Sequence, residues 1–222
     1  MRQPYITKEI FPVKCYSFNA PEQLTPSVLE ECKKLQYKSL NEPAGVGTSD
    51  EIQYLDQFQE MHQWFQHCVD TLHVDNGWEV DRLVVNKTWA NRSDAHSMHH
   101  HAAHRHPMSY LSGIYYLTGG TPTVFLDPID KREWGQFKLD GGLVDESLFW
   151  YHGGIGGLII FPSYIVHASE PNNSEFDRYT IAFNTFPTGH INSGAFDRSM
   201  ANVTVKGWST SDLGPLKLSD FT

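Results

Sequence analysis

The chain has 222 residues and a mass of 25.3 kDa, long enough for one domain with a sizeable core. Its 17 Lys and Arg against 26 Asp and Glu give a formal charge of −9, and no basic run could follow a phosphate backbone, which argues against nucleic-acid binding. Three widely spaced cysteines indicate neither a disulfide framework nor a thiolate zinc site, whereas six of the 12 histidines fall between His96 and His106.

The predicted elements are helical in the first part of the chain and β-rich in the remainder. Thr25 and Pro26 are typical of a helix start and predict a helix to about Leu40. A second helix is predicted from Glu51 to about Leu72, because apolar residues recur there at spacings of three and four. Later runs rich in β-branched and aromatic residues predict six strands: Leu83–Trp89, Tyr110–Leu117, Thr123–Leu126, Gly157–Phe161, Tyr164–His167 and Tyr179–Phe186.

Short strands with no helical pattern between them predict an antiparallel sandwich or barrel with helices packed outside. We expect a single domain over residues 1–222, with helical support from 1–78, a β-core from 79–190 and a C-terminal extension from 191–222. The start of the chain lacks the apolar core of a signal peptide, and no run reaches the roughly 20 apolar residues of a membrane span. A cytoplasmic protein without membrane contact is therefore expected.

His104 and His106 are the clearest candidates for metal ligands. Residues i and i+2 of an extended segment project to the same face, so the two imidazoles would converge while Arg105 points away. His167, at the end of a strand-like run, offers a third ligand. Three ligands on one side of a metal leave its other positions open, which is typical of a site for chemistry.

Arg178 follows His167 after a turn-rich segment, which predicts that the chain returns as an antiparallel neighbour of the metal-bearing strand. The planar guanidinium suits a carboxylate. Thr180, two residues further and on the same strand face, would add a hydroxyl to the same anion.

The other histidines of the cluster, from His96 to His101, are interpreted as a mobile loop that leads to the site in preference to an accessory zinc site. Trp89 and Trp134 are assigned to packing, because aromatic residues at strand positions belong to a core more often than to a contact surface. Trp150, beside a glycine-rich turn, is expected to border the substrate entrance.

These motifs occur in an order that resembles the iron(II)- and 2-oxoglutarate-dependent oxygenases, in their prolyl-4-hydroxylase-like part. The resemblance covers about residues 83–187 and is carried by three patterns: H-x-H-P-x-S-x-L-S-G-I-Y-Y-L, G-L-I-I-F-P-S-x-x-x-H and R-Y-T-I-A-F-N. With Phe11-Pro12 near the N-terminus, the chain more narrowly resembles a set of bacterial and phage oxygenases. The resemblance implies a mainly β fold with flanking N-terminal helices, the double-stranded β-helix, or cupin-like jelly roll.

The resemblance implies an Fe(II)- and 2-oxoglutarate-dependent dioxygenase, with hydroxylation of an unidentified substrate and release of succinate and CO2 as the default reaction. No catalytic residue is implied beyond the metal ligands. Dioxygen and a small-molecule or peptidyl substrate are the implied partners, and a homodimer is also considered. The residues assigned are His104, His106 and His167 to the metal, and Arg178, Tyr116, Thr180 and, as a weaker candidate, Ser112 to 2-oxoglutarate.

His106 stands where the related oxygenases usually have a carboxylate, so Asp94 or Asp127 is an alternative second ligand. Three other functions remain open from the residues. A three-histidine cupin-like dioxygenase without 2-oxoglutarate would leave Arg178 unexplained. A non-catalytic metal-binding structural protein would explain the histidines alone, and a hydrolytic zinc enzyme would lack a general base beside the ligands.

Overall fold

The computed structural model describes residues 12–39, 45–128, 148–191 and 201–205. A short 3-10 turn precedes the second of the two helices. The helices are α1 (Leu24–Lys33) and α2 (Gln59–Asn76), and the turn is η1 (Asp56–Phe58). The strands are β1 (Tyr16–Asn19), β2 (Lys38–Ser39), β3 (Gly47–Thr48), β4 (Val80–Ser93), β5 (Leu111–Tyr116), β6 (Thr123–Leu126), β7 (Leu148–Tyr151), β8 (Gly157–Pro162), β9 (His167–Ser169), β10 (Arg178–Ile191) and β11 (Ala201–Val203).

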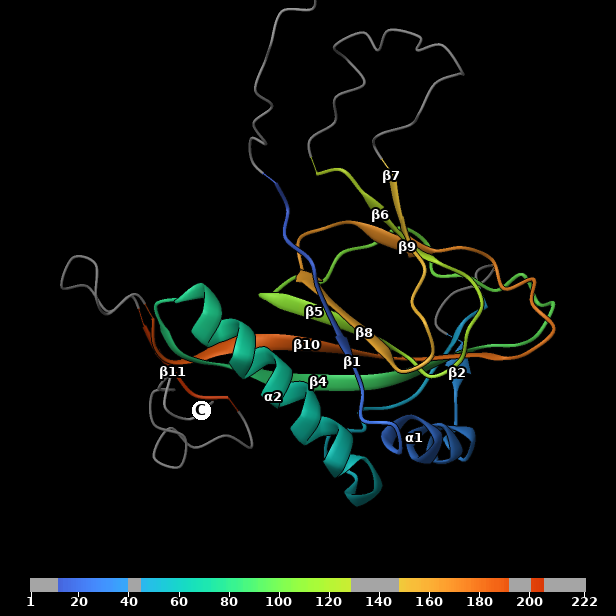
Figure 1. The fold of residues 1–222 in the computed structure, drawn as a ribbon, viewed down its shortest axis with the longest axis horizontal. Coiled ribbons are helices and arrows are strands. Elements are labelled where there is room, and N and C mark those ends of the chain that lie inside the picture. The colour runs from blue at the N-terminus through green and yellow to red at the C-terminus, as the bar shows by residue number, and fades with distance from the viewer. Residues whose placement is uncertain (1–11, 40–44, 129–147, 192–200, 206–222) are drawn as a thin grey trace, which may run out of the picture.

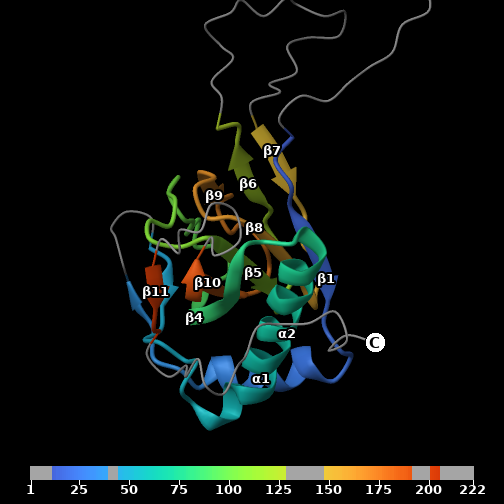
Figure 2. The ribbon, with the colours of Figure 1, turned by 90° about the vertical axis from the view of Figure 1, so that its left-hand side faces the viewer.

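The elements form three layers, with the helices on one face of a large sheet and a small sheet on the other face (Figures 1 and 2). The large sheet has eight strands, in the order β1–β8–β5–β10–β4–β3–β2, with β11 paired to β10. The small sheet has three strands, in the order β7–β6–β9. The predicted architecture, mainly antiparallel β with helices outside, is confirmed. Among the described residues, no helix combines the length and the apolar character needed to cross a membrane.

Helix α1 exists where it was predicted, but both of its ends differ. Thr25 lies inside the helix rather than at its N-cap, and its hydroxyl forms a 2.6 Å hydrogen bond with the Tyr115 phenol. The helix ends at Lys33 instead of Leu40, because the chain turns there and Tyr37 donates its hydroxyl back to the last helical turn. Tertiary contacts of Thr25 and Tyr37 therefore set the helix position.

Helix α2 begins at Gln59, later than the predicted Glu51. The intervening segment instead runs along β4, where the Ile52 N–H donates to the Thr88 carbonyl at 2.9 Å. The helix continues beyond its predicted end until Gly77, which takes a left-handed φ of 60°. Glycine adopts this conformation without strain and is the usual residue after a helix end.

The structure contains strands at five of the six predicted places, and the two central strands are longer than predicted. Strands β4 and β10 have 14 residues each and pair along most of their length. The prediction for 164–167 was wrong except at its last residue, because residues 164–166 form a turn and the strand runs from His167 to Ser169. The sequence does not predict β1, β2, β3, β7 and β11, because strands of two to four residues carry too little alternation to be recognised.

The main hydrophobic core lies between the helices and the large sheet. Tyr115 and Phe183, from β5 and β10, point to this side and meet Phe65 of α2 at ring-centroid distances of 5.6 and 4.8 Å. Each such buried ring contributes about 1.5–3 kcal/mol. Because strand residues alternate between faces, the neighbouring residues look toward the small sheet, where Ile159 and Phe161 belong to a second cluster.

Two glutamine side chains complete the edge of β4 where the strand leaves its pairing with β3. The Gln66 amide, from α2, accepts from the Val85 N–H at 2.9 Å and donates to the Leu83 carbonyl at 2.8 Å. Gln53 accepts from the Thr88 N–H at 3.0 Å. Both glutamines are buried, so their amides satisfy main-chain groups that a further strand would otherwise bind.

Replacing Gln66 with Met should destabilise the protein by about 2–4 kcal/mol, because the Val85 N–H and the Leu83 carbonyl would stay buried without partners. Gln63→Met, on the exposed side of the same helix, is the matched control and should change stability by less than about 0.5 kcal/mol. Urea unfolding monitored by circular dichroism measures both changes. Equal midpoints for the two variants would show that the strand edge does not depend on Gln66.

Candidate metal and cosubstrate site

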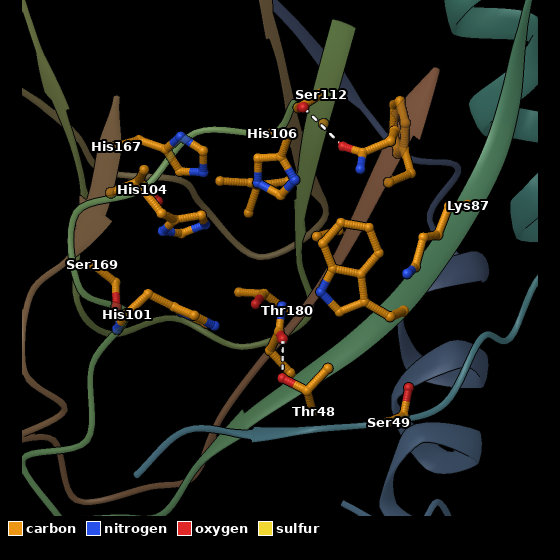
Figure 3. Close-up of a pocket in the computed structure, with 18 of the residues that line it drawn as sticks. Thr48, Ser49, Lys87, His101, His104, His106, Ser112, His167, Ser169 and Thr180 are labelled. Carbon is orange, nitrogen blue, oxygen red and sulfur yellow. Dashed lines mark hydrogen bonds between the residues drawn. The ribbon is translucent and has the colours of Figure 1, made fainter. Parts of the chain in front are cut away.

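A cavity of about 520 Å³ lies on the face of the large sheet that looks toward the small sheet (Figure 3). On β10, Thr180, Ala182 and Asn184 are two residues apart, so their side chains share this face. Each pairs with a residue on either side, and these partners therefore face the same way. The partners are Tyr116, Ile114 and Ser112 on β5, and Asn91, Trp89 and Lys87 on β4.

Three histidines meet at one side of this cavity. His104 and His167 are main-chain neighbours, and each N–H donates to the carbonyl of the other at 2.9 Å. The ring centroids of His104 and His167 are 4.4 Å apart, and the His106 ring lies 5.1 and 5.2 Å from them. One nitrogen from each ring falls within 4.8 Å of the others, close enough for one metal ion. The structure thus brings together the three histidines that the sequence singled out.

Main-chain carbonyls orient two of these rings. His104 Nδ1 lies 2.7 Å from the Ala102 carbonyl oxygen, and His167 Nδ1 lies 3.0 Å from the Ile165 carbonyl oxygen. Because a carbonyl oxygen can only accept, Nδ1 carries the proton in both rings. The lone pair of Nε2 is therefore the one available to a metal.

His106 is held by Trp89, whose ring centroid lies 5.6 Å away at an interplanar angle of 30°. Burial, reinforced by the charge of His104, lowers the pKa of His106 to about 4 and that of His167 to about 3. Both imidazoles are therefore neutral near pH 7. A neutral imidazole can bind a metal without first losing a proton.

Arg178 begins β10 and is 5% exposed. In the described part of the chain, no carboxylate forms an ion pair with its guanidinium. Burial lowers the pKa of Arg178, although a guanidinium stays charged in proteins. A buried cation without a counter-ion is costly, so this end of the cavity suits an anion. Thr180 lies two residues along the same strand face and is also buried.

Tyr116 does not line the cavity itself but is hydrogen-bonded to Thr123, which does. The two hydroxyls are 2.6 Å apart, and Thr123 lines the cavity, whereas the Tyr116 ring packs against Gly153. A Cβ at Gly153 would lie 2.3 Å from that ring, so glycine leaves the space that the ring needs. Burial raises the pKa of Tyr116 to about 12, although the Thr123 hydrogen bond and the Arg178 charge act in the opposite direction. The phenol is therefore protonated and able to donate.

Ser112 faces the cavity far from Arg178. It pairs with Asn184, which is six residues along β10 from Arg178, or about 20 Å at the rise of a strand. Its hydroxyl lies 2.9 Å from Asn184 Oδ1 and 2.8 Å from Ser163 Oγ. The structure thus groups Ser112 with the residues near His106 rather than with the guanidinium.

The histidine-rich loop runs alongside the segment that follows β9. The His96 N–H donates to the Ser174 carbonyl at 3.1 Å, and the Met98 N–H donates to the Asn172 carbonyl at 3.2 Å. The buried Asn172 amide also donates to two carbonyls at the end of β4 and just after it. The segment is a loop, as predicted, but these hydrogen bonds fasten it at several points.

One residue of this loop, His101, lines the cavity, although the sequence does not predict this position. Its ring lies 5.9 Å from the His104 ring and projects inward between Ser169 and Thr180 in Figure 3. Burial, together with the charges of Arg178 and the three other histidines, lowers the pKa of His101 to about 3. No sequence signal separates this residue from the neighbouring histidines.

The carboxylates considered as alternatives to His106 lie elsewhere. Asp94 is exposed and pairs with Arg92 at 2.9 Å. Asp127 borders a separate, largely apolar pocket beyond β6. Neither carboxylate belongs to the cluster formed by the three histidines.

The interpretation of the tryptophans was wrong at two positions. Trp89 lines the cavity beside His106 instead of serving only as packing. Trp150 is exposed, donates its indole N–H to Glu170 at 3.2 Å and is not part of the cavity lining. A spacing of two along β4, from Lys87 through Trp89 to Asn91, was the signal that could have placed Trp89 on the cavity face. Trp134 lies outside the described residues.

Comparison with known proteins agrees with this geometry. Residues 87–184 match a family model described as "Putative 2OG-Fe(II) oxygenase", whereas a search of curated proteins finds no match. Among solved structures, the chain is similar to SnoN, a non-heme α-ketoglutarate-dependent epimerase from nogalamycin biosynthesis, at 12% identity over 87% of this chain and 90% of that chain, with a TM-score of 0.64. It is also similar to a Pseudomonas putida prolyl-4-hydroxylase, at 11% identity over 79% and 93% of the chains and a TM-score of 0.58. HygX from Streptomyces hygroscopicus, solved with nickel, 2-oxoglutarate and hygromycin B, gives 12% identity over 90% and 95%, with a TM-score of 0.56.

At these identities the solved structures establish the fold, and the predicted double-stranded β-helix is confirmed. The family match adds the class: residues 87–184 match the domain of the 2OG-Fe(II) oxygenases. Iron(II) and 2-oxoglutarate are the metal and cosubstrate of this class, as the resemblance implied. The residues fit both groups, because three imidazole nitrogens suit a divalent metal and the buried Arg178 suits a carboxylate.

The metal-free protein should lose stability as the pH falls. An unfolded histidine binds a proton near pH 6.5, whereas buried His167 does so only near pH 3, so acidification between these values favours unfolding. His167→Gln should therefore reduce the slope of stability against pH in this window by up to about 1.4 kcal/mol per pH unit, the equivalent of one proton. Urea unfolding in EDTA at several pH values measures the slope. Parallel curves for the two proteins would contradict the prediction.

Proposed function

We propose that this oxygenase hydroxylates a C–H bond of its substrate, with His104, His106 and His167 as iron ligands and Arg178 as the anchor of 2-oxoglutarate. One observation carries the proposal. A buried guanidinium without a carboxylate partner in the described chain lines the same cavity as three convergent imidazoles. A 2-oxo acid with a second carboxylate at its far end matches both features.

In this proposal, different side chains bind the metal and the cosubstrate. The three histidines hold the metal from one side and leave its other positions to the cosubstrate and dioxygen. Arg178 pairs with the distal carboxylate, and the Thr180 hydroxyl donates to it from the same strand face. Tyr116 supports this end through Thr123. Ser112 is outside this set, because its register places it with Asn184.

Iron(II) with 2-oxoglutarate supplies the activation of dioxygen: one oxygen atom enters succinate, which leaves with CO2, and the other enters the substrate. The protein contributes orientation and a binding cavity. Three neutral histidines leave the metal one charge unit more positive than two histidines and a carboxylate would. This extra positive charge favours the doubly negative cosubstrate.

Anaerobic titration of the iron(II)-loaded protein with 2-oxoglutarate tests the proposal directly. We expect a weak visible metal-to-ligand charge-transfer band. Arg178→Gln should raise the Kd of 2-oxoglutarate at least about 30-fold, because the carboxylate would lose a buried charge partner worth about 2 kcal/mol or more. Arg105→Gln is the matched control, since Arg105 is exposed between two of the metal ligands. A folded, iron-loaded protein that shows no band would refute the proposal.

The role of His106 can be tested with two substitutions. His106→Ala should weaken iron(II) binding about 100-fold or more, since loss of a group that merely supports a ligand already costs 10–100-fold. His106→Asp should keep the metal but bind 2-oxoglutarate more weakly than the wild type, because the added negative charge opposes the dianion. Metal titration followed by 2-oxoglutarate titration measures both. Full iron affinity in His106→Ala would show that another residue completes the site.

The kind of reaction follows from the change in substrate mass. Hydroxylation adds one oxygen atom, epimerisation leaves the mass unchanged, and ring closure removes two hydrogens. Peptides, amino acids and small metabolites can be screened through succinate release and then analysed by mass spectrometry. A three-histidine dioxygenase without 2-oxoglutarate is the second candidate. Arg178, buried and without a carboxylate partner among the residues that the structure describes, argues against it.

A further inference from the structure

The cavity holds a fourth imidazole for which the proposed function gives no role. The main chain of His101 is held in place by hydrogen bonds. Its N–H donates to Ser169 Oγ at 2.8 Å. The His101 carbonyl accepts from the Ser169 N–H at 3.2 Å. These two hydrogen bonds direct the side chain into the cavity rather than toward solvent (Figure 3).

The His101 ring lines the same cavity as both ends of the proposed cosubstrate site. Its centroid lies 5.9 Å from that of His104, a proposed iron ligand. The positive charge of Arg178, the proposed carboxylate anchor, also reaches it and contributes to lowering its pKa. The ring is therefore near enough to both ends to contact a molecule that binds the metal and Arg178 together.

Two other roles fit the structure less well. His101 does not belong to the group of histidines whose nitrogens lie within 4.8 Å of one another, so it is not placed as a fourth metal ligand. It does not belong to either hydrophobic cluster. Among the described residues, its ring nitrogens have no hydrogen-bond partner, so a donor remains free inside the cavity.

We propose that His101 donates a hydrogen bond to a carboxylate oxygen of 2-oxoglutarate and positions the cosubstrate between Arg178 and the metal. This inference rests on the proposed function. A neutral imidazole suits the place, because it offers one N–H without adding a further positive charge beside the guanidinium and the metal. A hydrogen bond to an ionised acceptor is worth about 1.5–3 kcal/mol, which corresponds to about 10–100-fold in affinity.

Calorimetric titration of the Mn(II)-loaded protein with 2-oxoglutarate tests this contact without turnover. His101→Leu removes the donor and should raise the Kd of 2-oxoglutarate at least about 10-fold. His101→Gln keeps an amide N–H and should recover most of that loss. Both variants should bind Mn(II) as the wild type does. His100→Leu is the matched control, since this neighbouring histidine does not line the cavity and should leave both affinities unchanged.

A measurement on the wild-type protein makes the test independent of whether the variants fold. Diethyl pyrocarbonate labelling of His101, read by mass spectrometry, should decrease when 2-oxoglutarate is added to the metal-loaded protein. Unchanged labelling, or an unchanged Kd in His101→Leu, would overturn the inference. A loss of Mn(II) affinity equal to that of His104→Ala would also overturn it, by making His101 a metal ligand. Wild-type protein that binds Mn(II) but no 2-oxoglutarate would instead refute the proposed function.

Discussion

The cluster of three histidines depends on one main-chain pairing, the antiparallel bridge between His104 and His167. Its two 2.9 Å hydrogen bonds join segments that are far apart in the sequence and place the two rings 4.4 Å apart. His106 follows two residues later and reaches the same point. The bridge continues toward Ser169, which holds His101. Four imidazoles therefore enter one cavity from two short segments whose relative position is set by the same set of main-chain hydrogen bonds.

The large sheet separates the two tasks of stability and binding between its faces. Adjacent tyrosines on β5 illustrate this: Tyr115 packs against Phe65 of α2 and bonds to Thr25, whereas Tyr116 points to the opposite side and bonds to Thr123. Burial of apolar rings under the helices fixes the orientation of each strand about its axis. The position of the cavity residues on the face toward the small sheet is a direct consequence of that orientation.

The electrostatics of the cavity contrast with those of the whole chain. The protein carries a formal charge of −9, but one end of the cavity contains the buried guanidinium of Arg178. Burial keeps the nearby imidazoles of His101 and His167 neutral near pH 7 by lowering their pKa values. This part of the site thus presents the permanent positive charge of Arg178 together with neutral donors and ligands. This combination suits a divalent metal together with an organic anion.

The sequence by itself determined the class of the protein, the two helices, five of the strands of the fold and the three histidines of the cluster. These features depend on local periodicity and on short motifs such as His104-Arg105-His106, which a single segment contains. Only the tertiary structure decided that His101 and Trp89 enter the cavity and that Ser112 lies far from Arg178. Those relations depend on the register between strands distant in the sequence, and register is set by packing and by main-chain pairing, which local spacing does not encode.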